Sequence, residues 1–347
     1  MNLKTAQALG LAVPPSLLVC DEMIEHGRRR FANLRRALFG AVWLVTLAFS
    51  TPSRSEMLVD ENVRASMLAQ ADGRIAHVET SNNDIFITKI GSNLMMSFRL
   101  RGAEFTQSYV NLIDADDLQM AYTQVMTAAV AYAETPKQIL MIGLGGGAIP
   151  TYLARFMPDA TIATVEIDPG VIEAAKRYFG ILETSRVRYL AADGRVFLNR
   201  SSARHDVILV DAYHGDSVPF HLLTKEFYTL VKQRLTPNGA AAFNVRLGTK
   251  LYAATLMTLK EVFPTIEIYP VNDYQVIVIA SNSFRPDDET LSRNATALQE
   301  RYRFRYALPQ LVAKRLDPML AVPRSGVVLT DDFAPVEFLD SSPEQRK

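Results

Sequence analysis

Residues 138–148 read QILMIGLGGGA, an apolar run that leads directly into a cluster of glycines. The run at 138–142 predicts a buried strand, and a helix is expected to begin at about Ala148. Gly143, Gly145 and Gly147 would let the connecting turn fold tightly, so that backbone N–H groups could approach a ligand closely. A plain tight turn also uses glycine, so the residues that follow the next strands decide whether this turn binds a nucleotide.

The remainder of the chain up to residue 280 alternates between short apolar runs and amphipathic segments. Strands with few polar residues, separated by helices, indicate a parallel sheet that is covered on both faces. Strands are expected at 161–167, 187–191, 207–211 and 239–245, and helices at 148–157, 169–179, around 196–198, at 224–234 and at 250–262. Two further strands, at 266–269 and 274–280, have no helix between them and therefore predict an antiparallel edge pair.

A different pattern precedes this region. Short β-like runs at 74–79, 84–90 and 94–99 are separated by turn residues, which predicts a small antiparallel sheet. Apolar residues at helical spacing then predict a helix over 116–132, with Asp114 or Asp116 as its cap. The expected organisation is a leader at 1–55, a β-domain at 56–115, an α/β domain at 116–285 and a C-terminal extension at 286–347.

Acidic residues follow three successive strands of the expected parallel sheet. Glu166 lies about 20 residues beyond the glycine turn, where an acidic side chain meets ribose hydroxyls in nucleotide-binding folds. Asp168 could contact the ribose or cap the next helix. Asp193, which precedes Gly194, could accept a hydrogen bond from an adenine amino group or act as a helix cap. Asp211 ends the following strand, so Glu166, Asp193 and Asp211 are all expected at one crevice.

Composition limits the possible partners. The chain carries 37 basic and 37 acidic residues, which argues against a nucleic-acid binder because such proteins usually have a basic excess. Its single cysteine, Cys20, excludes an internal disulfide and a cysteine-based zinc site. No metal is expected, and a small molecule is the expected partner.

The N-terminus has the order of a signal peptide. Arg28, Arg29, Arg30, Arg35 and Arg36 precede an apolar run at 37–49 and then small residues. That run of about 13 residues is shorter than the roughly 20 that span a bilayer as a helix. The pattern suggests export or membrane contact through the leader. The alternatives are an interfacial or disordered leader in a cytoplasmic protein, or a true start at Met23.

With these residues placed, the chain resembles the spermidine synthase (polyamine aminopropyltransferase) family over residues 74–281. The matching segments are 142–147 (IGLGGG), 165–168 (VEID), 192–195 (ADGR), 210–213 (VDAY) and 223–228 (LTKEFY). Gln107 and Tyr122 lie where the family places pocket residues. The segment 329–337 (LTDDFAPVE) is similar to the tail of the spermidine-synthase-like branch of that family.

The resemblance implies a methyltransferase-like Rossmann fold, with a mostly parallel seven-stranded sheet behind a small β-domain, and a homodimer. It implies transfer of an aminopropyl group from decarboxylated S-adenosylmethionine to a diamine such as putrescine. Asp211 would be the catalytic base, assisted by Tyr122. The donor would contact Gln107, Gly143, Gly145, Gly147, Glu166, Asp168, Asp193 and Gly194, and the acceptor would contact Tyr213, His214 and Asp216.

Two positions depart from the family pattern. Ala148 stands where the family has an aspartate that contacts the aminopropyl amine, and His214 replaces a second acid of the diamine site. Loss of these anions should weaken binding of cations. A methyltransferase that uses intact S-adenosylmethionine, and a non-catalytic homologue that binds a nucleoside or a polyamine, therefore remain as alternatives.

Overall fold

The computed structural model of the protein describes residues 56–213, 215, 217–283, 286–317 and 325–341. The described fold belongs to one compact unit, Met57–Lys347. The predictions of a leader at 1–55 and of a start at Met23 fall outside the described residues. No helix in the described ranges is long and apolar enough to cross a membrane.

The N-terminal part is an antiparallel sheet of four strands, which confirms the expected small β-domain. It follows α4 (Glu61–Leu68), whose first N–H groups are capped by the Asp60 carboxylate. The strands pair in sequence order and are β1 (Gly73–Glu79), β2 (Asp84–Ile90), β3 (Asn93–Leu100) and β4 (Ala103–Asn111). The sequence prediction missed β4 because this strand is mostly polar and exposed over its first half.

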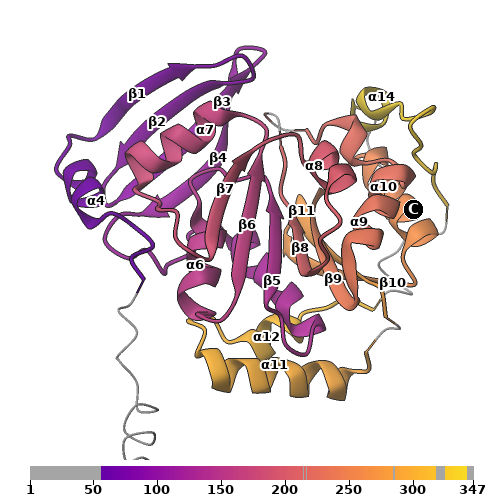
Figure 1. Ribbon diagram of the computed structural model, residues 1–347. Coiled ribbons are helices and arrows are strands. Elements are labelled where there is room, and N and C mark those ends of the chain that lie inside the picture. The colour runs from indigo at the N-terminus through magenta and orange to yellow at the C-terminus, as the bar shows by residue number, and fades with distance from the viewer. Residues whose placement is uncertain (1–55, 214, 216, 284–285, 318–324, 342–347) are drawn as a thin grey trace, which may run out of the picture. The chain divides into compact units, whose positions relative to one another are not determined.

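The larger sheet has seven strands in the order β10-β11-β9-β8-β5-β6-β7 (Figure 1). Strands β5 to β9 are parallel, whereas β11 is antiparallel to both β9 and β10. The mostly parallel α/β sheet and its antiparallel edge pair are thereby confirmed. The bounds are β5 (Gln138–Ile142), β6 (Thr161–Glu166), β7 (Val187–Ala191), β8 (His205–Val210), β9 (Leu235–Arg246), β10 (Thr265–Asn272) and β11 (Gln275–Ser281).

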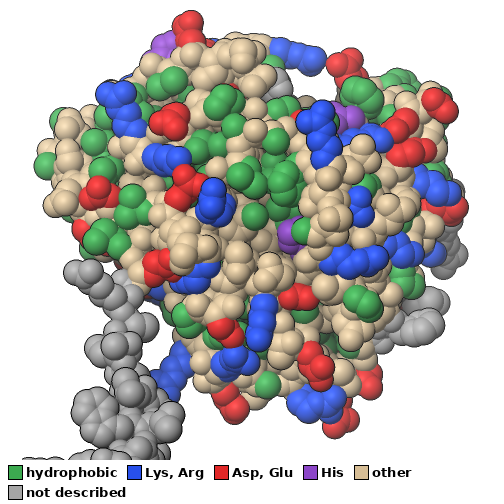
Figure 2. Space-filling model, in the orientation of Figure 1, with side chains coloured by type: hydrophobic (Ala, Val, Ile, Leu, Met, Phe, Trp, Pro, Cys, Tyr) green, Lys and Arg blue, Asp and Glu red, His purple; other side chains and the backbone are tan. Residues whose placement is uncertain are grey.

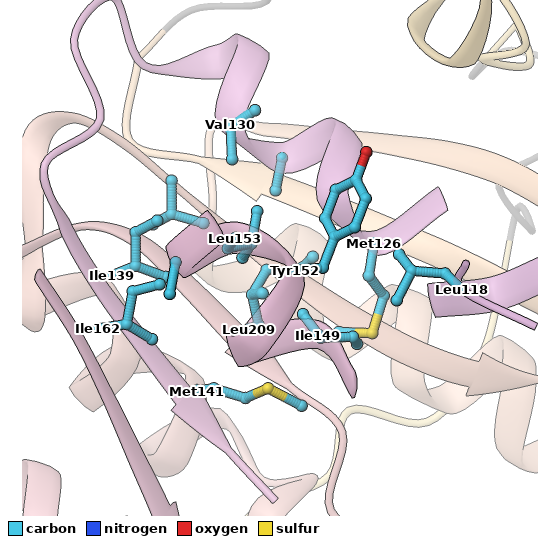
Figure 3. Close-up of a cluster of buried hydrophobic side chains, with 14 of the residues drawn as sticks. Leu118, Met126, Val130, Ile139, Met141, Ile149, Tyr152, Leu153, Ile162 and Leu209 are labelled. Carbon is cyan, nitrogen blue, oxygen red and sulfur yellow. The ribbon is translucent and has the colours of Figure 1, made fainter. Parts of the chain in front are cut away.

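Alternate residues of these strands enter two different cores, as the twofold side-chain period of a strand requires. Ile139 and Met141 of β5 belong to one core, and Leu140 and Ile142 to the other. The first core, part of which is drawn in Figure 3, includes α6 (Ala148–Phe156) and α7 (Pro169–Ala174). The second includes α8 (Gly194–Arg200), α9 (Lys225–Arg234) and α10 (Lys250–Val262). Helices therefore cover both faces of the sheet. Because β5 to β9 run parallel, their carboxyl ends lie at one edge.

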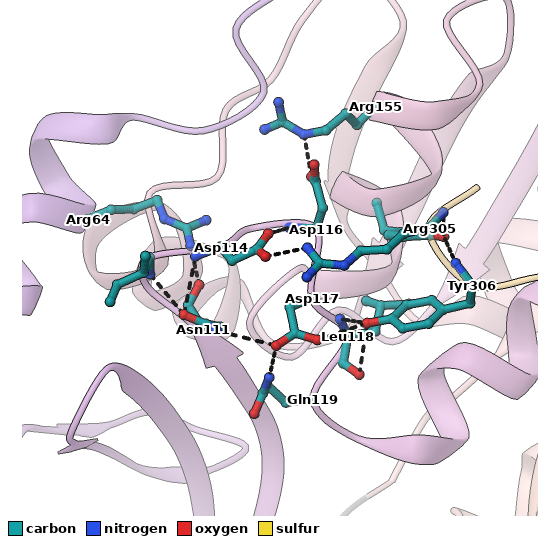
Figure 4. Close-up of polar contacts among 12 residues, drawn as sticks. Arg64, Asn111, Asp114, Asp116, Asp117, Leu118, Gln119, Arg155, Arg305 and Tyr306 are labelled. Atoms are coloured by element: carbon teal, nitrogen blue, oxygen red, sulfur yellow. Dashed lines mark hydrogen bonds and ion pairs between the residues drawn. The ribbon is translucent and has the colours of Figure 1, made fainter. Parts of the chain in front are cut away.

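The helix predicted over 116–132 is wrong in its first part. The structure has a loop up to Met120, then α5 (Ala121–Met126) and the 3₁₀ helix η1 (Thr127–Tyr132). Asp114 and Asp116 do not cap α5, because their carboxylates pair with Arg305 and Arg155 (Figure 4). These tertiary ion pairs outweigh the local helical pattern and hold the loop that leads into α5.

The C-terminal extension contains α11 (Asp288–Tyr302), α12 (Leu308–Val312) and α14 (Val336–Ser341). After α12, Arg315 reaches a buried carboxylate of the sheet, Glu267 on β10, with 3.2 Å between Nη1 and Oε1. The extension is thus attached to the edge of the α/β sheet rather than separate from it.

Candidate active site

The glycine turn connects β5 to α6 in a conformation that side chains would obstruct. Gly143, Gly145 and Gly147 adopt φ values of 94°, 55° and 77°. A Cβ on Gly143 would lie 2.1 Å from the carbonyl oxygen of Asp211, at the end of β8. Gly147 caps α6 in the left-handed conformation. The turn therefore keeps the ends of β5 and β8 in close backbone contact.

Glu166 ends β6 beside this turn. Its carboxylate accepts hydrogen bonds from the backbone N–H groups of Leu144, at 2.9 Å, and of Asp168, at 3.0 Å. Burial raises the pKa of the Glu166 carboxyl, and the N–H donors of Asp168 and Leu144 act in the opposite direction. Because these donors fix the carboxylate at the cavity wall, its remaining lone pairs are available to a pair of ribose hydroxyls.

We expect Glu166→Gln to weaken binding of adenosyl nucleosides by about 10- to 100-fold, the value of a hydrogen bond to a charged group. Titration calorimetry with methylthioadenosine measures this loss. Glu173→Gln, on the exposed side of α7, is the matched control and should bind normally. Unchanged affinity in Glu166→Gln would contradict the predicted contact between Glu166 and the ribose.

Asp168 caps α7, which is one of the two roles that the sequence allowed. It is fully buried and caps α7 by accepting from the Gly170 N–H at 2.8 Å. Its other oxygen accepts from Thr80 Oγ1 at 2.6 Å and from Asn83 Nδ2 at 2.7 Å. Asp168 is not among the residues that line the cavity, and its carboxylate joins the β1–β2 turn to the α/β domain.

Asp193 and Gly194 follow β7 and line the cavity. Asp193 caps α8 through the Val196 N–H, as one interpretation of the sequence expected. Its second oxygen lies 3.0 Å from Nε2 of His221, which also lines the cavity. A Cβ on Gly194 would lie 2.4 Å from a methyl group of Ile142, so this position closes tightly on β5. Asp193 therefore both caps α8 and lines the cavity.

Asp211 lies at the end of β8 between two neutral donors. Tyr122 Oη on α5 and Asn244 Nδ2 on β9 each donate to its carboxylate at 2.9 Å. Burial raises the pKa of the Asp211 carboxyl, while the hydrogen bonds from Asn244 and Tyr122 oppose that rise. Burial and the neighbouring Asp211 raise the pKa of the Tyr122 phenol well above its usual value, so Tyr122 stays a donor. The result is a carboxylate fixed in place and able to accept a proton.

Tyr213 and Gln107 complete the described part of this end of the cavity. The Tyr213 hydroxyl donates to the Asn244 carbonyl at 3.1 Å. Gln107, on β4, donates to the carbonyl of Gly215 at 3.0 Å and thereby joins the small sheet to the loop after β8. His214 and Asp216, predicted to contact the acceptor, lie outside the described residues.

These groups surround one cavity of about 550 Å³, within the size range of small-ligand sites. The structure brings together Gln107, Tyr122, Gly143, Gly145, Glu166, Asp193, Gly194, Asp211 and Tyr213 at its wall, together with Ala148. Gly147 and Asp168 are not part of that wall. The face of the molecule in Figure 2 carries acidic and basic side chains intermixed, in line with the zero net charge.

Asn244, Gln275 and His221 also line the cavity, and the sequence interpretation missed them. Gln275 Nε2 donates to Asn244 Oδ1 at 2.7 Å, which leaves the Asn244 amide nitrogen directed at Asp211. Asn244 is a polar residue within the otherwise apolar run at 239–245, and that interruption was the available signal. No comparable signal distinguished Gln275, because the approach of β11 to β9 is a tertiary event.

Comparison with known proteins shows which family the chain is similar to. The spermine/spermidine synthase domain model matches residues 119–287. The polyamine aminopropyltransferase of Vibrio vulnificus (strain CMCP6) is 30% identical over 227 residues, covering 63% of this chain and 75% of that protein. The polyamine aminopropyltransferase of Chromobacterium violaceum is 32% identical over 209 residues, covering 58% of this chain and 79% of that protein.

A solved structure agrees at the level of the fold. A spermidine synthase crystallised with the transition state analogue AdoDATO superposes with a TM-score of 0.55 at 19% identity, covering 72% of this chain and 86% of that one. The shared fold, together with the two bacterial relatives, supports the resemblance found in the motifs. The chain belongs to the spermidine synthase (polyamine aminopropyltransferase) family of transferases.

Proposed function

We propose that the protein transfers an aminopropyl group from decarboxylated S-adenosylmethionine to a diamine or polyamine such as putrescine. The observation that carries this proposal is the position of Asp211. Its carboxylate lies in the same cavity as the glycine turn and Glu166, and its described hydrogen-bond partners are Tyr122 and Asn244. A nucleoside at one end and a proton acceptor at the other are what amine alkylation by a sulfonium donor requires.

The donor end is formed by the strand ends of β5, β6 and β7. Glu166 would accept from the ribose hydroxyls, and Asp193 would accept from the adenine amino group while its carboxylate is held by the α8 cap. The sulfonium of the donor would then face the end of β8, where Asp211 lies. The protein supplies alignment above all, because a sulfonium leaving group is already activated.

At the acceptor end, Asp211 would take one proton from the attacking nitrogen. The amine lone pair forms the new carbon–nitrogen bond as the carbon–sulfur bond breaks, and the sulfur leaves as neutral methylthioadenosine. The departing proton passes to Asp211, whose raised pKa makes it a better base than an exposed aspartate. Tyr122, held protonated, would keep the carboxylate oriented toward the nitrogen.

The test is incubation of the purified protein with decarboxylated or intact S-adenosylmethionine and a panel of amines, read by mass spectrometry. We expect methylthioadenosine and an aminopropylated amine from the decarboxylated donor. Absence of methylthioadenosine with every amine would overturn the proposal. Binding of nucleoside or polyamine without turnover would instead support a non-catalytic homologue.

A second candidate is methyl transfer from intact S-adenosylmethionine. Ala148 favours it, because this residue lines the cavity next to the glycine turn and offers no carboxylate for the ammonium of an aminopropyl arm. In the same assay, a methylated amine and S-adenosylhomocysteine would be the products.

We further propose that the protein forms a homodimer and that residues 1–55 direct export or membrane association. Light scattering of the purified chain measures the first, and a reporter fused to residues 1–55 measures the second. A monomeric mass would contradict the dimer, and a cytoplasmic reporter would contradict export.

A further inference from the structure

The last described segment, residues 325–341, contacts α10 and the first residue of α9. Leu329 is fully buried there. Its N–H donates to Thr258 Oγ1 at 2.9 Å, and its carbonyl accepts from the Lys225 N–H at 2.8 Å. These bonds fix the chain immediately before Asp331, so the position of the Asp331 carboxylate is defined by the fold.

Asp331 pairs with a residue of α8, the helix that begins at Gly194 on the cavity wall. Arg195 Nη1 lies 2.8 Å from Asp331 Oδ1, and its second terminal nitrogen contacts the other carboxylate oxygen. Thr224 Oγ1 donates to the same Oδ1 at 2.7 Å. The ion pair holds the pKa of Asp331 below its usual range, so the contact is charged at neutral pH.

Arg195 also contacts the 3₁₀ helix η3 (Phe220–Leu222), which bears His221. The same Nη1 donates to the His221 carbonyl at 3.0 Å. The His221 imidazole in turn contacts the Asp193 carboxylate at 3.0 Å, and both side chains line the cavity. Three consecutive contacts therefore connect the Asp331 carboxylate, which lies outside the cavity wall, to the end of the cavity where the adenine of the donor would bind.

We propose that Asp331 is a positioning residue. It holds the side chains of Asp193 and His221, which line the cavity, in the geometry needed to bind the adenine of the adenosyl donor. The inference rests on the proposed adenosyl donor, and it concerns affinity for the donor rather than the transfer step. Asp211 and Tyr122 are on other elements, so loss of Asp331 should leave the reacting end intact.

The variant Asp331→Asn tests this, with Asp332→Asn as its matched control. Asp332 is adjacent and exposed, and its side chain makes no hydrogen bond or ion pair among the described residues. We expect Asp331→Asn to weaken methylthioadenosine binding about fivefold, at the low end of coupling between distinct sites. The KM for the donor should rise by a similar factor while kcat stays unchanged. Asp331→Glu should recover most of the affinity, and Asp332→Asn should match the wild type.

The outcomes separate this inference from the proposed function. If the wild type binds methylthioadenosine and Asp331→Asn binds it equally well, the positioning role is wrong and the function stands. If the wild type binds no adenosyl nucleoside, the proposed function itself fails. A fall in kcat with unchanged KM would also contradict the inference. Should Asp331→Asn fold poorly, Arg195→Lys keeps the charge, removes the two-pronged contact and should give the same KM effect.

Discussion

Asp211→Asn is expected to lower kcat for amine alkylation by about 10²- to 10⁴-fold, the usual contribution of a positioned general base. Asparagine has nearly the same shape and still accepts the Tyr122 hydrogen bond, but it cannot take up the proton of the attacking amine. The adenosyl end of the cavity is formed by other residues, so methylthioadenosine should bind the variant with nearly wild-type affinity. Steady-state kinetics and calorimetry on the same preparation measure both quantities.

The matched control is Asp206→Asn, at the opposite end of β8. Asp206 accepts hydrogen bonds from the backbone N–H groups of Lys137 and Gln138, outside the cavity, and its variant should retain kcat.

The pH dependence of kcat gives a second test of Asp211. Burial raises the pKa of the Asp211 carboxyl, and only the ionised carboxylate can accept a proton. The wild-type rate should therefore fall on the acid side with an apparent pKa above that of an ordinary aspartate. Asp211→Asn should lose that fall. If the variant keeps more than a tenth of wild-type kcat, Asp211 is not the base.

Gly143→Ala should destabilise the fold by about 3 kcal/mol, the sum of a positive-φ penalty and a clash in a packed interior. The residue has φ 94°, and a Cβ there would lie 2.1 Å from the Asp211 carbonyl oxygen. Both obstacles are backbone features, so no side-chain rotation relieves them. Urea denaturation followed by circular dichroism measures the loss, and donor binding should fall with it because the turn and β8 are pushed apart.

The variant Gly91→Ala separates the positive-φ penalty from the steric clash. Gly91 has φ 59°, and nothing lies within 4 Å of a Cβ added to it, so only the conformational penalty of about 1 kcal/mol applies. The denaturation midpoint of Gly143→Ala should therefore fall well below that of Gly91→Ala. Equal midpoints would show that the close approach of the glycine turn to β8 is not present in solution.

The sequence predicted most of the α/β sheet because the central parallel strands, such as β5 and β8, are buried on both faces and read as short apolar runs. The parallel strand at 138–142 follows this rule, and the two antiparallel edge strands, predicted at 266–269 and 274–280, are also mostly buried and apolar. The predicted bounds of these strands agree with the structure to within three residues. The cavity acids were also predictable, since carboxyl ends of parallel strands meet at one edge. Glu166, Asp193 and Asp211 all line one cavity for this reason.

The side-chain roles that could not be predicted from the sequence depend on tertiary contacts. Asp114 and Asp116 were predicted as possible caps of a long helix, but Asp114 pairs with Arg305, 191 positions along the chain, and Asp116 pairs with Arg155. From the sequence, Asp168 could contact a ligand or cap a helix. In the structure it caps α7, and its second oxygen accepts from Thr80 and Asn83 of the distant β1–β2 turn. The partners of Asp211 are on α5 and β9, which no local pattern brings together.

The most direct test of the account is the product balance of the wild-type protein incubated with decarboxylated S-adenosylmethionine and putrescine. Mass spectrometry should find one methylthioadenosine for each aminopropylated amine formed, and the Asp211→Asn protein should form both products at least about 100-fold more slowly, in line with the contribution of a positioned general base. Methylthioadenosine without an aminopropylated product, or neither product at any amine concentration, would contradict a site in which Asp211 activates an amine beside an adenosyl donor.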